Sequence, residues 1–215
     1  CSLNSYNQGT YKTYYGDYMS PTGTLRALNI FINIIYDQTP DDDPMTGKLS
    51  PLWMPGEINS ININPPAYLD EFMDNEFNPD LITGSFTKRF AEASFNQLIV
   101  LGDFTVVNIP QSRITPGNPG GSFKYTDLIK ESIKLINENG GLHAIHHHDS
   151  IADYDGMQIS PSGRFIYKDR NYNNKIDLVQ FFVRNCTRKH GSLDNGGHTG
   201  FTIAEPILIK GTYYY

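Results

Sequence analysis

The chain of 215 residues is 39% hydrophobic, 19% charged and 13% aromatic, with a formal net charge of −6 at pH 7. This composition excludes a disordered chain and is sufficient for one domain with a substantial core. The negative charge and the absence of long Lys/Arg runs exclude nucleic acid as an expected partner, and no apolar stretch approaches the roughly 20 residues of a membrane-spanning helix.

Residues 1–23 are polar and are predicted to form a leader or tether. Cys1 opens the chain, and a mature chain that begins Cys-Ser before a polar stretch is similar to bacterial lipoproteins, in which the N-terminal Cys carries the lipid. A disulfide between Cys1 and Cys186 and an arbitrary boundary of the sequence are the alternatives. Because the chain has only two cysteines, a disulfide framework and a cysteine zinc site are excluded.

A long strand is predicted from Leu25 to Tyr36. Apolar residues recur there at every second position, which is typical of a strand, and we expect this strand to be central in its sheet. Residues 37–66 then form a long excursion that contains the acidic run Asp41–Asp43. We expect the acidic run to be a solvated surface segment, with cation binding as the alternative.

Three helices are predicted from apolar residues spaced three and four positions apart. The first begins at Pro66, the second is capped by Ser85, and the third runs from about Thr126 to a stop at Gly140–Gly141. The residues predicted to face the core are Leu69, Phe72, Met73 and Phe77 in the first helix, Phe86, Phe90 and Ala93 in the second, and Ile129, Ile133 and Ile136 in the third.

Two more strands are predicted. One spans Leu98–Ile109, where the Gly102-Asp103 pair indicates a tight hairpin or a bulge. The other is the last strand, Leu178–Arg184, whose Val179, Phe181 and Val183 are predicted to face the core. These elements predict the α+β class: a single domain over residues 24–215, with a mixed, twisted sheet flanked by helices.

The segment from Asp169 to Asp177 has the spacing of a cation-binding loop. Asn174 stands where the backbone of such a loop must turn, and Ile176 stands where an apolar anchor is usual. The candidate calcium ligands, at the first, third, fifth and ninth positions, are Asp169, Asn171, Asn173 and Asp177. Because only two of these are carboxylates, the loop predicts weak calcium binding. The alternative is an Asn-rich turn before a strand.

A second candidate metal site lies in the histidine-rich segment before Asp149. His143, His146 and His148 are weaker candidates as ligands of zinc or copper, and Asp149 can orient one of them. Three or four ligands must converge on such a metal, and adjacent histidines rarely all point inward. The alternative is therefore a polar surface edge after the preceding helix.

Common catalytic patterns are absent from the sequence. It contains no His-Glu-x-x-His, no Gly-x-Ser-x-Gly and no phosphate-binding loop. Cys186 has His190 four residues further on, which is a weak pattern for a nucleophile. The residues alone therefore predict no assembled active site.

Several segments nevertheless occur in the order seen in one known family. The first strand precedes a helix reading Thr-Lys-Arg-Phe-Ala-Glu-Ala-Ser-Phe (87–95), which precedes Leu-Ile-Val-Leu-Gly-Asp (98–103) and a further helix. Ile-Ala-Asp-Tyr-Asp (151–155), the loop 169–177 and Leu-Val-Gln-Phe-Phe-Val-Arg (178–184) follow. Across roughly residues 24 to 200, this order resembles the front part of the immune-inhibitor-A type of secreted, metzincin-like zinc metallopeptidase.

In that family the Asp/Gly-rich segment precedes a helix whose His-Glu-x-x-His binds the catalytic zinc. The resemblance therefore implies the front half of a zincin-type domain, with no catalytic residue in this chain and with zinc only where a missing C-terminal part supplies its ligands. It carries over only the cation role of the loop 169–177. Asn173-Asn174 stands there in place of the family's Asp-Gly.

We therefore expect a secreted or surface-anchored metallopeptidase-like domain that is inactive by itself. It is either a fragment or a complete but inactive relative, with a protein partner or the rest of its own parent chain beside it. A lipid on Cys1 would anchor it at the bacterial cell surface or outer membrane. The alternative is a surface lipoprotein subunit that serves as a binding or structural module, in which aromatic residues such as Trp53 contact a protein or a glycan.

Overall fold

The computed structural model describes residues 11–13, 16–18, 23–43, 58, 60–62, 66–116, 121, 124–142, 176, 178–184, 206–209 and 212–214. Its central sheet has the strand order β4-β5-β3-β6. Three strands run parallel: β3 (Gly23–Ile35), β5 (Leu98–Pro110) and β6 (Leu178–Val183). The short β4 (Ile61–Asn62) pairs antiparallel with β5, so the prediction of an α+β fold with a mixed sheet is confirmed.

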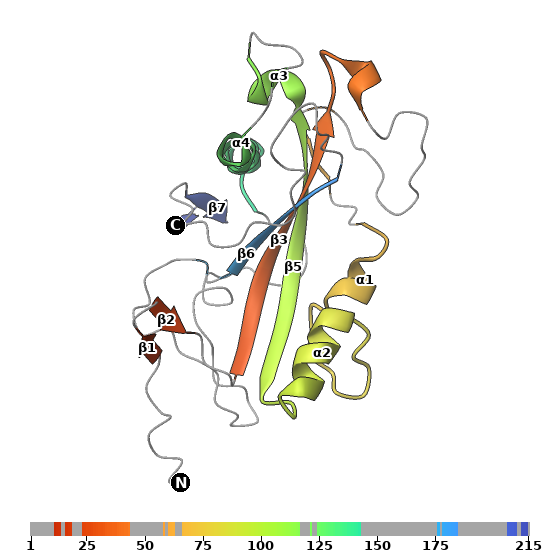
Figure 1. Cartoon of the computed structure of the whole chain (residues 1–215), viewed down its shortest axis with the longest axis vertical. Coiled ribbons are helices and arrows are strands. Elements are labelled where there is room, and N and C mark those ends of the chain that lie inside the picture. The colour runs from red at the N-terminus through yellow and green to blue at the C-terminus, as the bar shows by residue number, and fades with distance from the viewer. Residues whose placement is uncertain are drawn as a thin grey trace.

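Helices cover the sheet from both sides (Figure 1). Between β3 and β5 the chain forms the 3-10 helix η2 (Pro40–Asp42), α1 (Leu69–Phe72) and α2 (Ser85–Ala93). Between β5 and β6 it forms α3 (Gln111–Ile114) and α4 (Tyr125–Glu138). α4 lies on one side of the sheet, and α1 and α2 lie on the other.

Two small hairpins lie outside the central sheet. β1 (Tyr11–Thr13) pairs with β2 (Gly16–Tyr18), and β7 (Ile207–Ile209) pairs with β8 (Thr212–Tyr214). The strand predicted at Leu178–Arg184 is therefore not the last strand of the chain. β7 lies against α4, where the Asn137 side chain donates a hydrogen bond of 3.0 Å to the Pro206 carbonyl.

The two long strands are paired without interruption. Gly23 is opposite Leu98 at one end, and Ile35 is opposite Pro110 at the other. Nearly every side chain of both strands is buried, on both faces. Parallel strands covered by helices on two sides have this burial. β3 lies between β5 and β6, so it is a central strand, as predicted.

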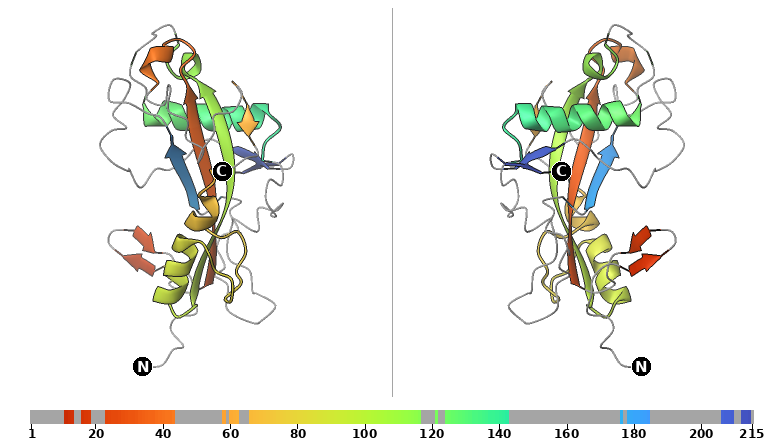
Figure 2. Two further views of the ribbon diagram at one scale, coloured as in Figure 1. Left: turned by 90° about the vertical axis from the view of Figure 1, so that its right-hand side faces the viewer. Right: turned by 90° about the vertical axis from the view of Figure 1, so that its left-hand side faces the viewer.

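Among the described residues, the buried apolar side chains form four clusters. The largest lies on the α4 side of the sheet and joins β3 residues such as Ile30 and Ile32 to Ile136 of α4. On the α1 side, the Phe31 ring stacks on Phe182 with centroids 5.0 Å apart. Figure 2 shows α4 crossing the upper part of the long strands while α2 lies along their lower part.

The hairpin or bulge predicted at Gly102-Asp103 is wrong, because β5 passes through both residues and stays in register with β3. The glycine is required for packing instead. A Cβ at Gly102 would lie 2.2 Å from the Met73 sulfur and 2.5 Å from Nδ2 of Asn29. The absent side chain thus lets the Met73 side chain cross the strand.

The start of α2 also differs from the prediction. Gly84 is the residue before the first helical turn, and Ser85 makes no capping hydrogen bond. The residues buried by α2 are Thr87 and Ala91, whereas Ala93 is exposed. The threonine hydroxyl donates to the Val100 carbonyl at 2.7 Å, which ties the helix to β5.

The third predicted helix is confirmed as α4. Ile133 and Ile136 are buried and Ile129 is partly buried against the same cluster. After Glu138 the chain leaves the helix through Gly140 and Gly141, whose φ angles are 90° and 83°. Glycine adopts this left-handed conformation without a steric penalty, so the predicted stop is explained.

Candidate ligand site at the carboxyl ends of the strands

The strand order creates a reversal at the carboxyl end of β3. β5 follows β3 along the chain and lies on one side of it, whereas β6 lies on the other side. The two connections contain helices on opposite faces of the sheet. In open parallel sheets, ligands bind outside the carboxyl ends of the strands at such a reversal.

A row of hydrogen-bonded polar side chains crosses the sheet near this end. Arg184 Nη1 donates to Asn33 Oδ1 at 3.1 Å, and Asn33 Nδ2 donates to Asn108 Oδ1 at 3.0 Å. Asn108 Nδ2 then donates to the hydroxyl oxygen of Ser60 at 3.0 Å. We call these four residues the amide row, and it links the residue after β6 to β3, β5 and the residue before β4.

The orientation of each amide in the row is determined by its neighbours. A guanidinium can only donate, so Oδ1 of Asn33 must face Arg184 and its Nδ2 must face Asn108. Asn33 is 1% exposed and Asn108 is fully buried. Buried amides of this kind are stable only when hydrogen-bonded, and aligned dipoles along a row strengthen each bond.

Gln111 lies at the same end, directly after β5. Its Oε1 accepts hydrogen bonds from the backbone N–H and the hydroxyl of Thr39, at 3.2 and 3.0 Å. Its Nε2 is buried and has no partner in the structure, and the same is true of Nε of Arg184. Among the described residues, these are the two buried side-chain nitrogens without a partner, and the hydroxyl of Thr105 and Oδ1 of Asn29 are the two buried oxygens without one.

The charge of Arg184 is only partly solvated. Desolvation by burial lowers the pKa of Arg184, and attraction to Asp43 opposes this effect. A guanidinium remains charged at any pH at which proteins are folded, so the site keeps a cation with unused hydrogen-bond capacity. Asp37 and the acidic run Asp41–Asp43 lie at the same end of the sheet, just after β3.

An open groove of about 700 Å³ lies beside this end, on the α4 side. Arg113 of α3 occupies one wall and is bound by two carboxylates of α4. Its Nη1 and Nη2 contact both oxygens of Glu138 at 2.8 and 3.1 Å, and its Nε contacts Glu131 at 3.0 Å. The hydrogen bonds from Arg113 lower the pKa of Glu138. Because its charge is already matched, Arg113 ties α3 to α4 and offers little to a ligand.

The candidate residues named from the sequence lie outside the described residues. This holds for Asp169, Asn171, Asn173 and Asp177, for Cys1, and for His143, His146 and His148. Within the loop 169–177, Ile176 is described, and it packs against the large cluster on the α4 side. In the part of the chain that the structure describes, no group of three or more His, Cys, Asp or Glu side chains is arranged to bind a metal ion.

The amide row was not predicted. The available signal is Asn33, an amide side chain in a largely apolar strand. An amide in a strand buried on both faces needs a partner on a neighbouring strand, and that requirement is visible in a sequence. The identity of the partner depends on the register of two strands, so it cannot be identified from the sequence alone.

Comparison of the chain with known protein families, with curated proteins and with solved structures gives no match. The helices that the structure describes are all too short or too polar to cross a membrane.

Proposed function

We propose that the chain is a binding module whose ligand site lies at the carboxyl ends of β3, β5 and β6. The observation that carries this proposal is that both buried side-chain nitrogens without a partner among the described residues, Gln111 Nε2 and Arg184 Nε, lie at the carboxyl ends of the strands, where the strand order reverses. Leaving such a donor unpaired costs about 1–3 kcal/mol. A bound ligand that supplies an acceptor to these nitrogens would remove that cost.

The chemistry of the site favours binding over catalysis. Side-chain amides and a guanidinium neither take up nor release protons near neutral pH, so the amide row and Gln111 can orient a ligand but cannot act as general acid or base. The acidic residues Asp37 and Asp41–Asp43 at the same end disfavour an anion. The ligand is therefore a neutral polar molecule whose oxygen atoms accept hydrogen bonds.

The test is nuclear magnetic resonance with the whole chain labelled with ¹⁵N. Neutral saccharides and blocked dipeptides are titrated in turn, and the side-chain amide signals of Asn33, Asn108 and Gln111 are followed. We expect one ligand class to shift these signals, and we expect Arg184→Met to weaken that binding at least tenfold. Arg113→Met is the matched control and leaves it unchanged. Shifts confined to other regions, or none with either class, would contradict the proposal.

We also propose that the domain is related to the immune-inhibitor-A type of metallopeptidase. The order of strand, helix, strand, helix and strand on which the resemblance to immune-inhibitor-A-type metallopeptidases rests corresponds to β3, α2, β5, α4 and β6. This order supports a metallopeptidase-like domain that is inactive by itself, with the zinc ligands supplied by another part of a parent chain. The mass of the natural protein and its gene sequence test this proposal. A parent that continues without His-Glu-x-x-His refutes the peptidase relation.

We also propose that the loop 169–177 binds calcium weakly. The packing of Ile176 against the large cluster supports this proposal, because such a loop needs an apolar anchor. We expect calorimetric heat and a thermal shift at millimolar calcium, both lost in Asp169→Asn with Asp177→Asn. The absence of calorimetric heat at millimolar calcium would contradict calcium binding by this loop.

The remaining proposal is that a lipid on Cys1 holds the domain at the bacterial surface. The polar residues that follow Cys1 in the sequence support it. Mass spectrometry of the N-terminal peptide from the natural source decides it, because an unmodified Cys1 or a disulfide to Cys186 contradicts lipid attachment.

A further inference from the structure

β6 lies at one end of the central sheet. It is bonded to β3 along its whole length, from Leu178 opposite Ala27 to Val183 opposite Ile32. Within the described residues, no strand pairs with its other edge. Every one of its six side chains is partly exposed, whereas β3 and β5 are almost completely buried.

The sequence of β6 does not suit an exposed edge. It reads Leu-Val-Gln-Phe-Phe-Val and contains no charged residue, no proline and no glycine. Edge strands are normally protected from association by Lys, Pro or a bulge, and near-continuous apolar runs are typical of strands that are buried on both faces, as β3 and β5 are. Its composition is that of an interior strand placed at an edge.

The backbone groups of β6 that point outward can be identified. The Arg184 N–H donates to the Ile32 carbonyl at 2.9 Å, and successive residues of a strand point their backbone groups to opposite sides. Residues 178, 180 and 182 therefore bond to β3. Val179, Phe181 and Val183 each present one N–H and one C=O to the edge of β6 with which no described strand pairs.

We propose that β6 is the interface of a homodimer, in which β6 of a second copy pairs antiparallel with it. The two-fold axis passes at Phe181, so that Val179 lies opposite Val183 of the second copy and Phe181 lies opposite its own counterpart. In this register all three outward-pointing residues form hydrogen-bonded pairs. One continuous sheet then runs through both molecules.

The side chains favour the same register. Val179, Phe181 and Val183 all pack on the α4 side of the sheet. A two-fold axis perpendicular to the sheet keeps that side common to both copies, so these side chains meet their equivalents and extend the large apolar cluster across the interface. The same strand thus provides matching backbone groups and matching side chains.

We infer that the partner of the β6 edge is a second copy of the chain because β6 is complementary to itself in this register. Cross-strand neighbours from Val179 to Val183 are apolar or amide side chains, and no like charges meet. Arg184 lies opposite Leu178 of the second copy, so the two guanidinium groups are about six residues, or roughly 20 Å, apart. At physiological salt this exceeds the screening length of about 8 Å.

Hydrogen exchange of the whole chain tests the interface with an internal control. The amides of residues 180, 182 and 184 bond to β3 and are protected at any concentration. Those of 179, 181 and 183 are expected to exchange fast in dilute solution and to become protected as concentration rises, while the mass measured by sedimentation rises from 24.3 kDa toward twice that value. A monomer at every concentration, or a dimer whose outward amides stay unprotected, overturns the proposal.

A matched pair of variants separates the edge from the core. Val183→Pro removes an outward-pointing N–H and leaves the hydrogen bonds to β3 in place. Val183→Ala also replaces the valine side chain but keeps that N–H. We expect the proline variant to be monomeric with unchanged circular dichroism and the alanine variant to remain a dimer. If both variants dimerise equally, or only the alanine variant dissociates, β6 pairing is refuted.

Discussion

At the scale of single residues, Gly102 shows how one missing side chain allows a close crossing. The Met73 side chain passes over β5 at this point, and its sulfur also accepts a long hydrogen bond from Asn29 at 3.6 Å. Any Cβ at position 102 must displace one of these two side chains. The glycine is thus needed for packing, although its φ is not in the left-handed region.

We expect Gly102→Ala to lower the free energy of unfolding by about 1–3 kcal/mol, the usual cost of forcing an extra carbon into a packed core. Urea denaturation measures it. Combining the change with Met73→Ala is the control, because it removes the sulfur that the new Cβ meets. The two changes should cost less together than the sum of their separate costs, and strict additivity would show that the clash is absent.

Phe95 is the second informative residue. It is 87% exposed and follows α2 with a φ of 53°, and Asn96 has a φ of 60°. The turn is held by a hydrogen bond from the Asn96 N–H to the Ala91 carbonyl at 2.7 Å. A left-handed conformation costs a residue with a Cβ roughly 1–2 kcal/mol.

Phe95→Gly is therefore expected to raise the free energy of unfolding, by about 0.5–1 kcal/mol once the greater freedom of glycine in the unfolded chain is subtracted. The urea midpoint measures the change. Phe95→Ala, which keeps the Cβ and removes the exposed ring, should leave the midpoint nearly unchanged. A glycine variant no more stable than the alanine variant contradicts this account.

At the scale of elements, the amide row ties β6, β3 and β5 together at their carboxyl ends. Asn33→Leu removes the partner of two buried groups, Arg184 Nη1 and Asn108 Oδ1. We expect a loss of about 2–4 kcal/mol in the free energy of unfolding. The double variant Asn33→Leu with Asn108→Leu should lose much less than the sum of the single losses. Additive losses would mean that the two amides are independent.

α3 and α4 are joined by Arg113 and Glu138, and this tie depends on pH. The hydrogen bonds from Arg113 lower the pKa of Glu138 below its ordinary value of 4.5. The stability that the pair contributes is therefore complete above pH 4.5 and is lost as pH falls through the lowered pKa. Melting temperatures between pH 7 and pH 3 should fall less steeply in Glu138→Gln than in the parent, and equal slopes contradict the assignment.

How well the elements could be predicted depends on the range of the forces that form them. β3, β6 and α4 were predicted because their apolar spacing is local. The prediction of a hairpin or bulge at Gly102-Asp103 is wrong because a glycine in a sequence usually indicates a turn. Here the glycine makes room for the side chain of Met73, the residue that follows α1. The amide row joins Asn33 to residues 75 and 151 positions away, and no local pattern contains such a pairing.

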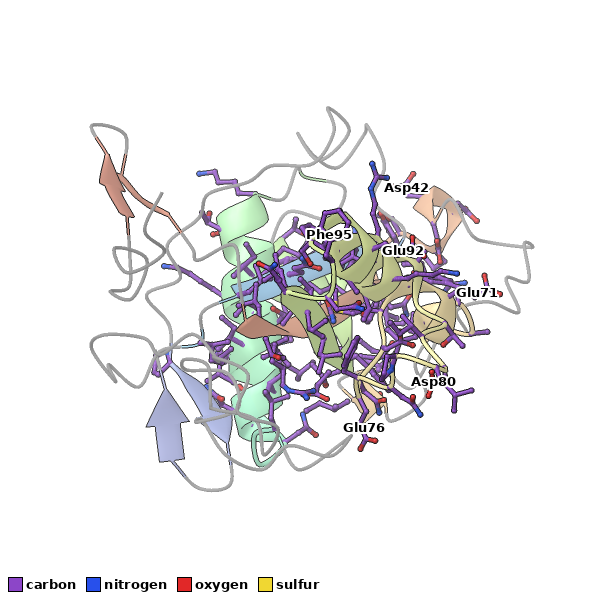
Figure 3. All side chains as sticks on the ribbon, turned by 90° about the horizontal axis from the view of Figure 1, so that it is seen from below. Asp42, Glu71, Glu76, Asp80, Glu92 and Phe95 are labelled. Atoms are coloured by element: carbon purple, nitrogen blue, oxygen red, sulfur yellow. The ribbon has the colours of Figure 1, made fainter. Side chains whose placement is uncertain are left out.

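At the scale of the whole molecule, charge is distributed unevenly. The labelled acidic side chains Glu71, Glu76, Asp80 and Glu92 lie on the side of the molecule that carries α1 and α2, away from α4 (Figure 3). All four are exposed. With a net charge of −6, repulsion among them opposes the folded state at low salt.

Sodium chloride is therefore expected to raise the urea midpoint, because it shortens the screening length from about 30 Å at 0.01 M to about 8 Å at 0.15 M. Glu76→Gln with Asp80→Asn should reduce this dependence. Glu131→Gln, on the α4 side and paired with Arg113, is the control and should not reduce it. A midpoint that falls with salt in the parent chain contradicts the uneven repulsion.

The position of β3 in the middle of the sheet has a consequence for the newly made chain. β3 is the first strand of the central sheet to be synthesised, and Asn33 meets Asn108 only 75 residues later and Arg184 only 151 residues later. At about 5–20 residues per second, on the order of 4–15 s pass before β5 is complete and on the order of 8–30 s before Arg184 exists. Until β5 is complete, a strand of thirteen mostly apolar residues lacks the neighbour with which it pairs along its whole length. Translation speed and chaperone supply, as much as final stability, thus determine how much of this protein reaches its native sheet.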